Sequence, residues 1–112
     1  MYSKELTKGT LQPIILKLIS SNGKMYGYEI TQQAKKITSG KIDISEGALY
    51  PILHKLEAKG VLTTEKVFIG KRVRKYYKVT KEGKEMVSEV TREIHDFIDT
   101  LGIIFNSETQ NT

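Results

Sequence analysis

The chain has 112 residues, a length that fits one domain built around a single hydrophobic core. The absence of cysteine excludes disulfides, thiol catalysis and Cys-ligated zinc, and it is typical of a cytoplasmic protein. No apolar run approaches the roughly 20 residues of a membrane-spanning helix, and no signal peptide opens the sequence. We therefore expect a small cytoplasmic domain without a membrane partner.

The net charge of +5 is concentrated in one segment. Residues 66–78 contain six basic side chains and no acidic one, whereas the rest of the chain has 12 basic residues against 13 acidic ones. The six are Lys66, Lys71, Arg72, Arg74, Lys75 and Lys78. Scattered lysines usually form a solvated surface, but an acid-free cluster favours a partner with a phosphate backbone.

The first two helices are predicted at about residues 10–21 and 26–37. Both have apolar residues at helical spacing, and the polar segment 20–23 separates them. At the start of the second helix, Gly27 permits close approach of another backbone. Its neighbour Tyr26 is either an aromatic residue at the edge of the core or a side chain that positions a phosphate.

The third helix, residues 45–59, is the segment around which the others are arranged. Ser45 supplies an N-cap hydroxyl, Glu46 places negative charge at the positive helix end, and Gly60 ends the helix. One face is an apolar stripe formed by Leu49, Ile52, Leu53 and Leu56. The opposite face is free to meet a partner and carries Gly47, Tyr50, His54 and Lys55.

Two β-branched and aromatic runs, residues 62–69 and 73–79, flank a short glycine-containing link and predict a hairpin that carries the basic cluster. Three helices followed by a two-stranded hairpin is the order of a winged helix-turn-helix, an α+β fold that is mostly helical. In this fold the third helix enters the DNA major groove and the hairpin, or wing, lies along the DNA. We therefore predict that residues 1–80 form a winged-helix domain whose partner is double-stranded DNA.

Thr80 is expected to cap a last helix that runs to about Phe105, with residues 81–106 as a dimerisation element and 107–112 as a disordered polar tail. Its apolar residues follow the 3.5-residue period of helices that pack along each other. Three helices and a hairpin cannot cover its whole length, which favours a homodimer, although Val87 and Val90 could instead pack on the chain's own core. The predicted dimerisation residues are Val87, Val90, Ile94, Phe97, Leu101 and Ile104.

Three blocks of the sequence carry a specific resemblance: residues 26–30 (Tyr-Gly-Tyr-Glu-Ile), 47–60, which include Leu49-Tyr50-Pro51, and 76–83. Together they resemble the PadR family of bacterial transcriptional regulators over about residues 9–105. The resemblance implies a homodimeric repressor that binds an inverted repeat in a promoter and dimerises through its last helix. It also implies release of the DNA by an effector, often a phenolic or other aromatic compound. Ala48 and the His54-Lys55 pair depart from the family pattern, which puts the base preference in doubt.

Candidate DNA contacts follow from side-chain chemistry. The tip of the third helix (Ser45, Glu46, Gly47, Ala48) reaches base edges first, and its free N–H groups can hold a phosphate. Tyr50 offers its hydroxyl to a phosphate or its ring to a thymine methyl, or else is an aromatic residue at the rim of the core. Because strand neighbours face opposite sides, Arg74 could point away from the DNA. The other candidates are Tyr26, His54, Lys55, Lys71, Arg72, Arg74 and Lys75.

A small-molecule effector could bind between the first and last helices. Candidate effector-binding residues are Ile14, Ile15, Leu18, Phe97, Ile98 and Leu101, although residues at this spacing are more often plain core.

The sequence shows no sign of a catalytic or metal site. His54 and His95 are far apart, and no metal-ligand spacing, phosphate-binding loop or nucleophile motif appears. We therefore expect no enzyme, no cofactor and no metal. The alternative is a winged-helix module for protein assembly or nonspecific nucleic-acid binding, because this fold serves several functions.

Overall fold

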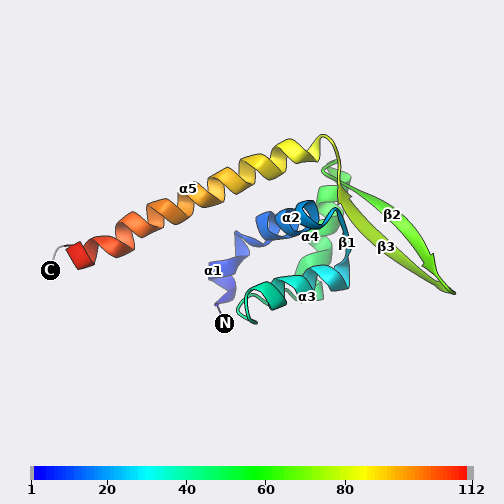
Figure 1. Ribbon diagram of the computed structural model, residues 1–112, viewed down its shortest axis with the longest axis horizontal. Coiled ribbons are helices and arrows are strands. Elements are labelled where there is room, and N and C mark those ends of the chain that lie inside the picture. The colour runs from blue at the N-terminus through cyan, green and yellow to red at the C-terminus, as the bar shows by residue number, and fades with distance from the viewer. Residues whose placement is uncertain (1, 111–112) are drawn as a thin grey trace.

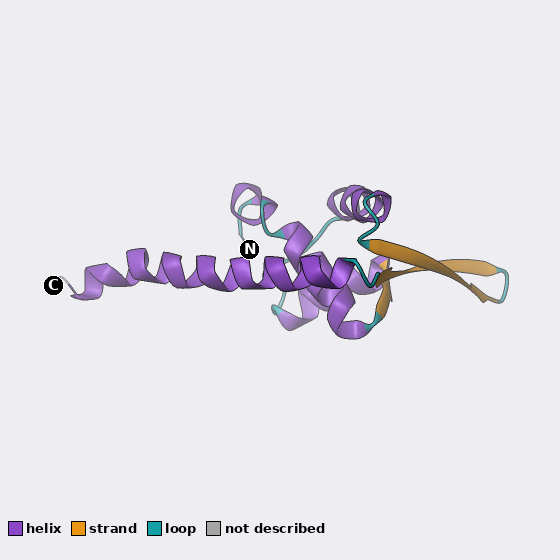
Figure 2. Ribbon diagram, turned by 90° about the horizontal axis from the view of Figure 1, so that it is seen from above, coloured by secondary structure: helices purple, strands orange, loops and turns teal. Residues whose placement is uncertain are grey.

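The computed structural model describes the backbone of residues 2–110 and the side chains of residues 2–106. Its elements are α1 (Lys4–Lys8), α2 (Leu11–Asn22), β1 (Lys24–Tyr26), α3 (Gly27–Ile37), α4 (Glu46–Ala58), β2 (Leu62–Ile69), β3 (Arg72–Val79) and α5 (Gly83–Gln110) (Figure 1). The predicted winged helix-turn-helix is confirmed, with α2, α3 and α4 as its three helices and β2–β3 as its wing. The wing and the C-terminal half of α5 extend from the helical body in opposite directions (Figure 2).

The wing belongs to a three-stranded antiparallel sheet in the order β1-β3-β2. Tyr77 in the central strand pairs with Met25 of β1 and with Thr64 of β2. Met25 and Tyr77 are both buried, so this face of the sheet covers the helices and the residues next to them in sequence lie on the outer face. The sequence prediction omitted β1, because a strand of three residues is too short to display alternation.

The core lies between α2, α3, α4 and the inner face of the sheet. The helices contribute side chains without solvent exposure and the sheet contributes Tyr77 at 2% exposure; the helical ones include Ile15, Leu16, Ile19, Ile30, Leu49, Leu53 and Leu56. At the start of α4, the Oγ of Ser45 accepts a hydrogen bond from the Ala48 N–H at 3.2 Å. Beyond its end, Gly60 has φ of +78°, the left-handed conformation that commonly ends a helix. Both caps are those that the sequence predicts and they set the ends of α4, while burial of Leu49, Leu53 and Leu56 determines which face turns outward.

Thr80 caps α5, as predicted. Its Oγ1 accepts a hydrogen bond from the Gly83 N–H at 2.9 Å and donates one to the Gly60 carbonyl at 2.7 Å. A side chain at position 83 would meet the carbonyl oxygen of Val61, so glycine is needed where α5 starts against the end of α4. These contacts tie the first turn of α5 to the segment that follows the third helix.

The N-terminal half of α5 packs along α2, and of the two roles that the sequence leaves open for Val87 and Val90 this contact favours packing within the chain. Val87 is only 7% exposed and belongs to the chain's own core, and Val90 packs against the edge of that core. Phe97, by contrast, is 52% exposed, and Leu101 and Ile104 are also exposed. The apolar stripe is continuous along the helix, but its first turns are used within the chain.

The helix continues to Gln110, past the predicted end at about Phe105. The backbone of residues 107–110, predicted as part of a disordered tail, is therefore helical, and residues 111–112 of that tail lie outside the described residues. None of the helices described is long and apolar enough to cross a membrane.

Candidate nucleic-acid interface

The outward face of α4 presents the residues that the sequence singled out. Ser45, Glu46 and Gly47 at its first turn are exposed, and Ala48 is half-buried because it packs against the core. His54 and Lys55 are exposed about two turns further along. A helix with one apolar face buried and its N-terminal turn open has the shape that enters a DNA major groove.

Tyr50 lies on this face and links α4 to α3. Its hydroxyl lies against Gly27, and a Cβ placed on Gly27 would be 2.8 Å from the ring carbon Cζ. The ring is nevertheless 36% exposed, so one side packs on α3 while the other meets solvent. Partial burial raises the pKa of Tyr50, and the nearby Glu46 carboxylate adds to the increase. The hydroxyl therefore keeps its proton at neutral pH and remains a hydrogen-bond donor.

Tyr26 lies beside Gly27, at the point where β1 ends and α3 begins. Its N–H donates to the Glu29 carboxylate at 3.1 Å, which satisfies one free donor of the first helical turn. The Tyr26 ring meets Tyr76 edge to face, with centroids 5.4 Å apart. The guanidinium carbon of Arg74 lies 4.1 Å from the centroid of the Tyr26 ring. Tyr26 is thus half-buried at the rim of the core and in contact with a basic wing residue.

Arg74 and Lys75 lie on opposite faces of β3, as strand alternation requires. Lys75 shares the inner face with Tyr77, and its Nζ lies 3.5 Å from a carboxylate oxygen of Glu57 in α4. Arg74 lies on the outer face, beside Tyr26 and the start of α3. Both residues are among the wing contacts that the sequence predicts, and strand alternation leaves only Arg74 in question there. The structure instead pairs Lys75 with a carboxylate and holds Arg74 next to the helix-turn-helix.

The tip of the wing is basic and partly apolar. Gly70 has φ of +64°, which lets the chain reverse in two residues, and Lys71 and Arg72 beside it are exposed. Phe68 and Val73 pair across the two strands and are also exposed, Phe68 by 74%. The sequence predicts Phe68 only as a strand residue. Its position two residues before the turn glycine is the signal that places it at the open end of the hairpin.

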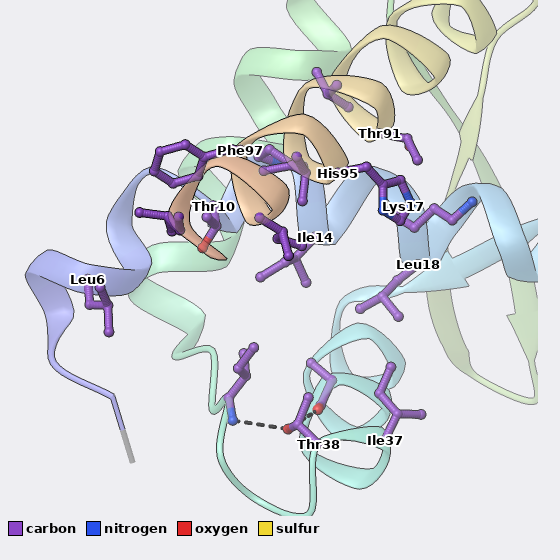
Figure 3. A pocket seen from close by; sticks show the side chains of 17 residues that line it. Leu6, Thr10, Ile14, Lys17, Leu18, Ile37, Thr38, Thr91, His95 and Phe97 are labelled. Carbon is purple, nitrogen blue, oxygen red and sulfur yellow. Dashed lines mark hydrogen bonds between the residues drawn. The ribbon is translucent and has the colours of Figure 1, made fainter. Parts of the chain in front are cut away.

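A separate apolar groove of about 600 Å³ runs between α1, α2, α3 and α5 (Figure 3). Five of the six predicted effector residues line it: Ile14, Leu18, Phe97, Ile98 and Leu101. Ile15 does not line it, because it lies in the core and has no solvent exposure. Polar side chains that the prediction missed also line the groove, among them Lys17, Thr91 and His95. These polar residues lie on the same faces of α2 and α5 as the apolar lining residues. The sequence alone cannot assign them to one groove, because it does not show that the two helices are neighbours.

Residues that could hold a metal do not come together in the part of the chain that the structure describes: no three His, Cys, Asp or Glu side chains form a suitable group. The features that do come together are an exposed helix tip, aromatic contacts around the start of α3 and a wing with a basic tip. This arrangement can bind a phosphate backbone and reach base edges.

A family model described as the transcriptional regulator PadR-like family matches residues 15–89. The match runs from within α2 to the first turns of α5, so it includes the helix-turn-helix and the wing.

Solved structures share the architecture. A transcriptional regulator from Clostridium thermocellum is similar over 91% of this chain and 96% of its own, with a TM-score of 0.80 and 26% sequence identity. A PadR family transcriptional regulator from Eggerthella lenta is similar over 90% of this chain and 86% of its own, with a TM-score of 0.74 and 33% identity. PadR of Bacillus subtilis, solved in complex with operator DNA, is similar over 73% of this chain and 45% of its own, with a TM-score of 0.66 and 28% identity.

Proposed function

Since this chain belongs to the PadR-like family of transcriptional regulators, we propose that it is a homodimeric repressor that binds an inverted-repeat operator in double-stranded DNA. In this proposal α4 enters the major groove and the wing follows the backbone. The protein acts in the cytoplasm, where a bacterial chromosome lies, and has no catalytic activity of its own. DNA binding by the similar Bacillus subtilis protein, which was solved with operator DNA, supports the choice of partner.

One observation carries the proposal: a single surface runs from the tip of α4 to the wing. Tyr50 on α4 contacts Gly27, Tyr26 precedes Gly27, and Arg74 of the wing stacks on Tyr26. The B-DNA major groove is about 12 Å wide and admits an α-helix, so α4 can reach base edges while the wing cations contact phosphates. An assembly module would not need a segment such as residues 66–78, with six basic side chains and no acidic one, beside an open helix tip.

The exposed half of α5 supports a homodimer. Its C-terminal turns carry Phe97, Ile98, Leu101, Ile104 and Phe105 at the surface, and such a contiguous apolar stripe marks an association site. A second copy of the same helix, packed along this stripe, would cover it. Two-fold symmetry would then place two α4 helices about one helical turn of DNA apart, roughly 34 Å.

The groove between α2 and α5 supports a release step by a small aromatic effector. Its lining is almost wholly apolar, and α5 forms one wall while also carrying the proposed dimer stripe. A ligand that binds in the groove would therefore act on the spacing of the two DNA-binding units. A shift of α5 would reach α4 through the contact between α5 and α2, because α2 packs in the same core as α4.

The test is a binding selection from random duplex DNA at two salt concentrations, together with the mass of the free protein by light scattering. We expect an enriched inverted repeat with half-sites about one turn apart and the mass of a dimer. Binding that ignores sequence and disappears with salt would leave only a nonspecific phosphate interaction. Absence of duplex binding altogether, by a folded protein, would instead favour a module for protein assembly.

A further inference from the structure

Three side chains form a stacked cluster on the outer face of the sheet. Tyr26 is the last residue of β1, and Arg74 and Tyr76 occupy alternate positions on β3. The planes of the two tyrosine rings are inclined at 80°, an edge-to-face arrangement that aromatic pairs favour. The Arg74 guanidinium lies over the face of the Tyr26 ring, and the neighbouring Tyr76 hydroxyl raises the pKa of Arg74. The position of the guanidinium is therefore set by contacts from two strands.

Unlike Lys24 and Lys75, Arg74 forms no ion pair with a carboxylate among the residues described. Lys24 pairs with Glu65 at 2.9 Å, and Lys75 pairs with Glu57 at 3.5 Å. The Glu29 carboxylate makes only a small contribution to the raised pKa of Arg74, and it accepts the Tyr26 N–H. Stacking on a ring leaves the in-plane N–H donors of a guanidinium available for a planar anionic partner. Arg74 is thus oriented but not neutralised.

The position of the cluster connects the wing with the helix-turn-helix. The Tyr26 backbone leads directly into α3, and the next residue, Gly27, contacts Tyr50 on the outward face of α4. Arg74 therefore lies between the α4 surface and the wing tip, where a DNA backbone that passes from one to the other would run. The Lys75 ammonium, on the opposite face of β3, does not have this position.

We propose that Tyr26 and Tyr76 are positioning residues that hold Arg74 ready to bind a DNA phosphate between α4 and the wing. This inference rests on the proposed DNA-binding function and specifies how one contact of that site is built. An arginine fixed before binding loses less conformational freedom when it meets the phosphate, so the rings increase affinity through Arg74 and without touching the DNA.

The experiment is a double-mutant cycle on one duplex that the wild-type protein binds, with dissociation constants measured across a range of salt. Arg74→Ala should weaken binding about tenfold and lower the salt slope by about one. Tyr26→Leu should weaken binding about two- to fivefold but keep the slope, because the charge remains. The double variant should bind no worse than Arg74→Ala, and Tyr26→Phe should restore most of the affinity that Tyr26→Leu loses.

Two further variants separate positioning from folding. Arg74→Lys keeps the charge but loses the planar stack, so it should keep the salt slope and bind about as weakly as Tyr26→Leu. Arg92→Ala removes an equal charge from the exposed surface of α5 and should leave affinity and slope unchanged. Urea unfolding of each variant identifies any that lose the fold.

Three results would overturn the inference. Multiplicative losses in the double variant would mean that Tyr26 acts independently of Arg74. A wild-type protein that binds DNA while Arg74→Ala binds equally well would remove Arg74 from the interface and leave the proposed function in place. A wild-type protein that binds no duplex would overturn the proposed function and this inference together.

Discussion

The hydroxyl of Tyr50 in α4 lies directly against the Cα of Gly27, the first residue of α3, with no room for a side chain between them. The two helices of the helix-turn-helix are therefore in contact near the N-terminal end of α4. Because φ of Gly27 is not in the left-handed region, the glycine is required by this close approach and not by its backbone conformation. The contact sets how far the tip of α4 stands out from α3.

Gly27→Ala should destabilise the protein, because the new methyl group would meet the Tyr50 ring. We expect a loss of about 1–3 kcal/mol in the free energy of unfolding, as for other overpacked sites. In a Tyr50→Ala background the same change should be neutral or stabilising by up to about 1 kcal/mol, because alanine is the better helix former. Urea unfolding of the four proteins gives both values. Equal effects in the two backgrounds would mean that Tyr50 does not cause the constraint.

The raised pKa of Tyr50 predicts a loss of stability in alkaline solution. Burial, then Glu46 and Tyr77, raise this pKa in the folded protein above its value in the unfolded chain. The neutral form of Tyr50 therefore contributes fully to the stability of the fold below about pH 10, the ordinary tyrosine pKa. This contribution is lost as the pH rises through the pKa of Tyr50 in the folded protein. Tyr50→Phe should reduce this loss between about pH 9 and pH 11, measured as the urea midpoint against pH. Parallel curves for the two proteins would contradict the assignment.

Arg72 and Lys75 should differ in their contribution to DNA binding. Arg72 is exposed near the wing tip, whereas the charge of Lys75 is partly compensated by Glu57. Arg72→Ala should weaken binding to all sequences alike and lower the salt slope by about one, and Lys75→Ala should lower it by less. Dissociation constants on an operator and on an unrelated duplex, each across a salt series, measure both effects. A loss confined to the operator would show that Arg72 reads sequence.

Removing the partner of Lys75 is the complementary experiment. The Lys75–Glu57 pair is partly exposed, so Glu57→Gln should change the free energy of unfolding by less than about 1 kcal/mol. The same change frees the lysine and removes a negative charge beside the wing, so DNA affinity should rise at low salt and converge with wild type at high salt. An affinity unchanged at every salt concentration would place Lys75 outside the interface.

The helices and the wing could be predicted from the sequence because their signals are local. They are the Ser45 cap, the apolar stripe of α4 with Gly60 after the helix, and the two β-branched runs around Gly70. The different roles of Arg74 and Lys75 could not be predicted in this way. Burial of Tyr77 in the tertiary structure decides which face of β3 is the inner one, and therefore which of the two residues lies on it. The same reason explains Val87. The apolar period of α5 is uniform, and only the contact with α2 determines which of its turns are used within the chain.

Substitutions in the two halves of α5 should have different effects, one on folding and the other on association. Phe97 is 52% exposed, whereas Val87 is 7% exposed in the core. Phe97→Asp should leave the urea midpoint of the monomer close to wild type but weaken the dimer by about 2 kcal/mol or more, as loss of an interface aromatic typically does.

Val87→Ala should act in the opposite sense, with a loss of about 1–3 kcal/mol in unfolding free energy and little effect on association once the protein is folded. Light scattering across a dilution series gives the association constant, and urea unfolding at low concentration gives the stability. Affinity for the operator should fall together with the association constant. Two DNA-binding units bind two half-sites with added affinity only while α5 holds the two units together. If Phe97→Asp remained dimeric with unchanged operator binding, the exposed stripe of α5 could not be what holds two copies together.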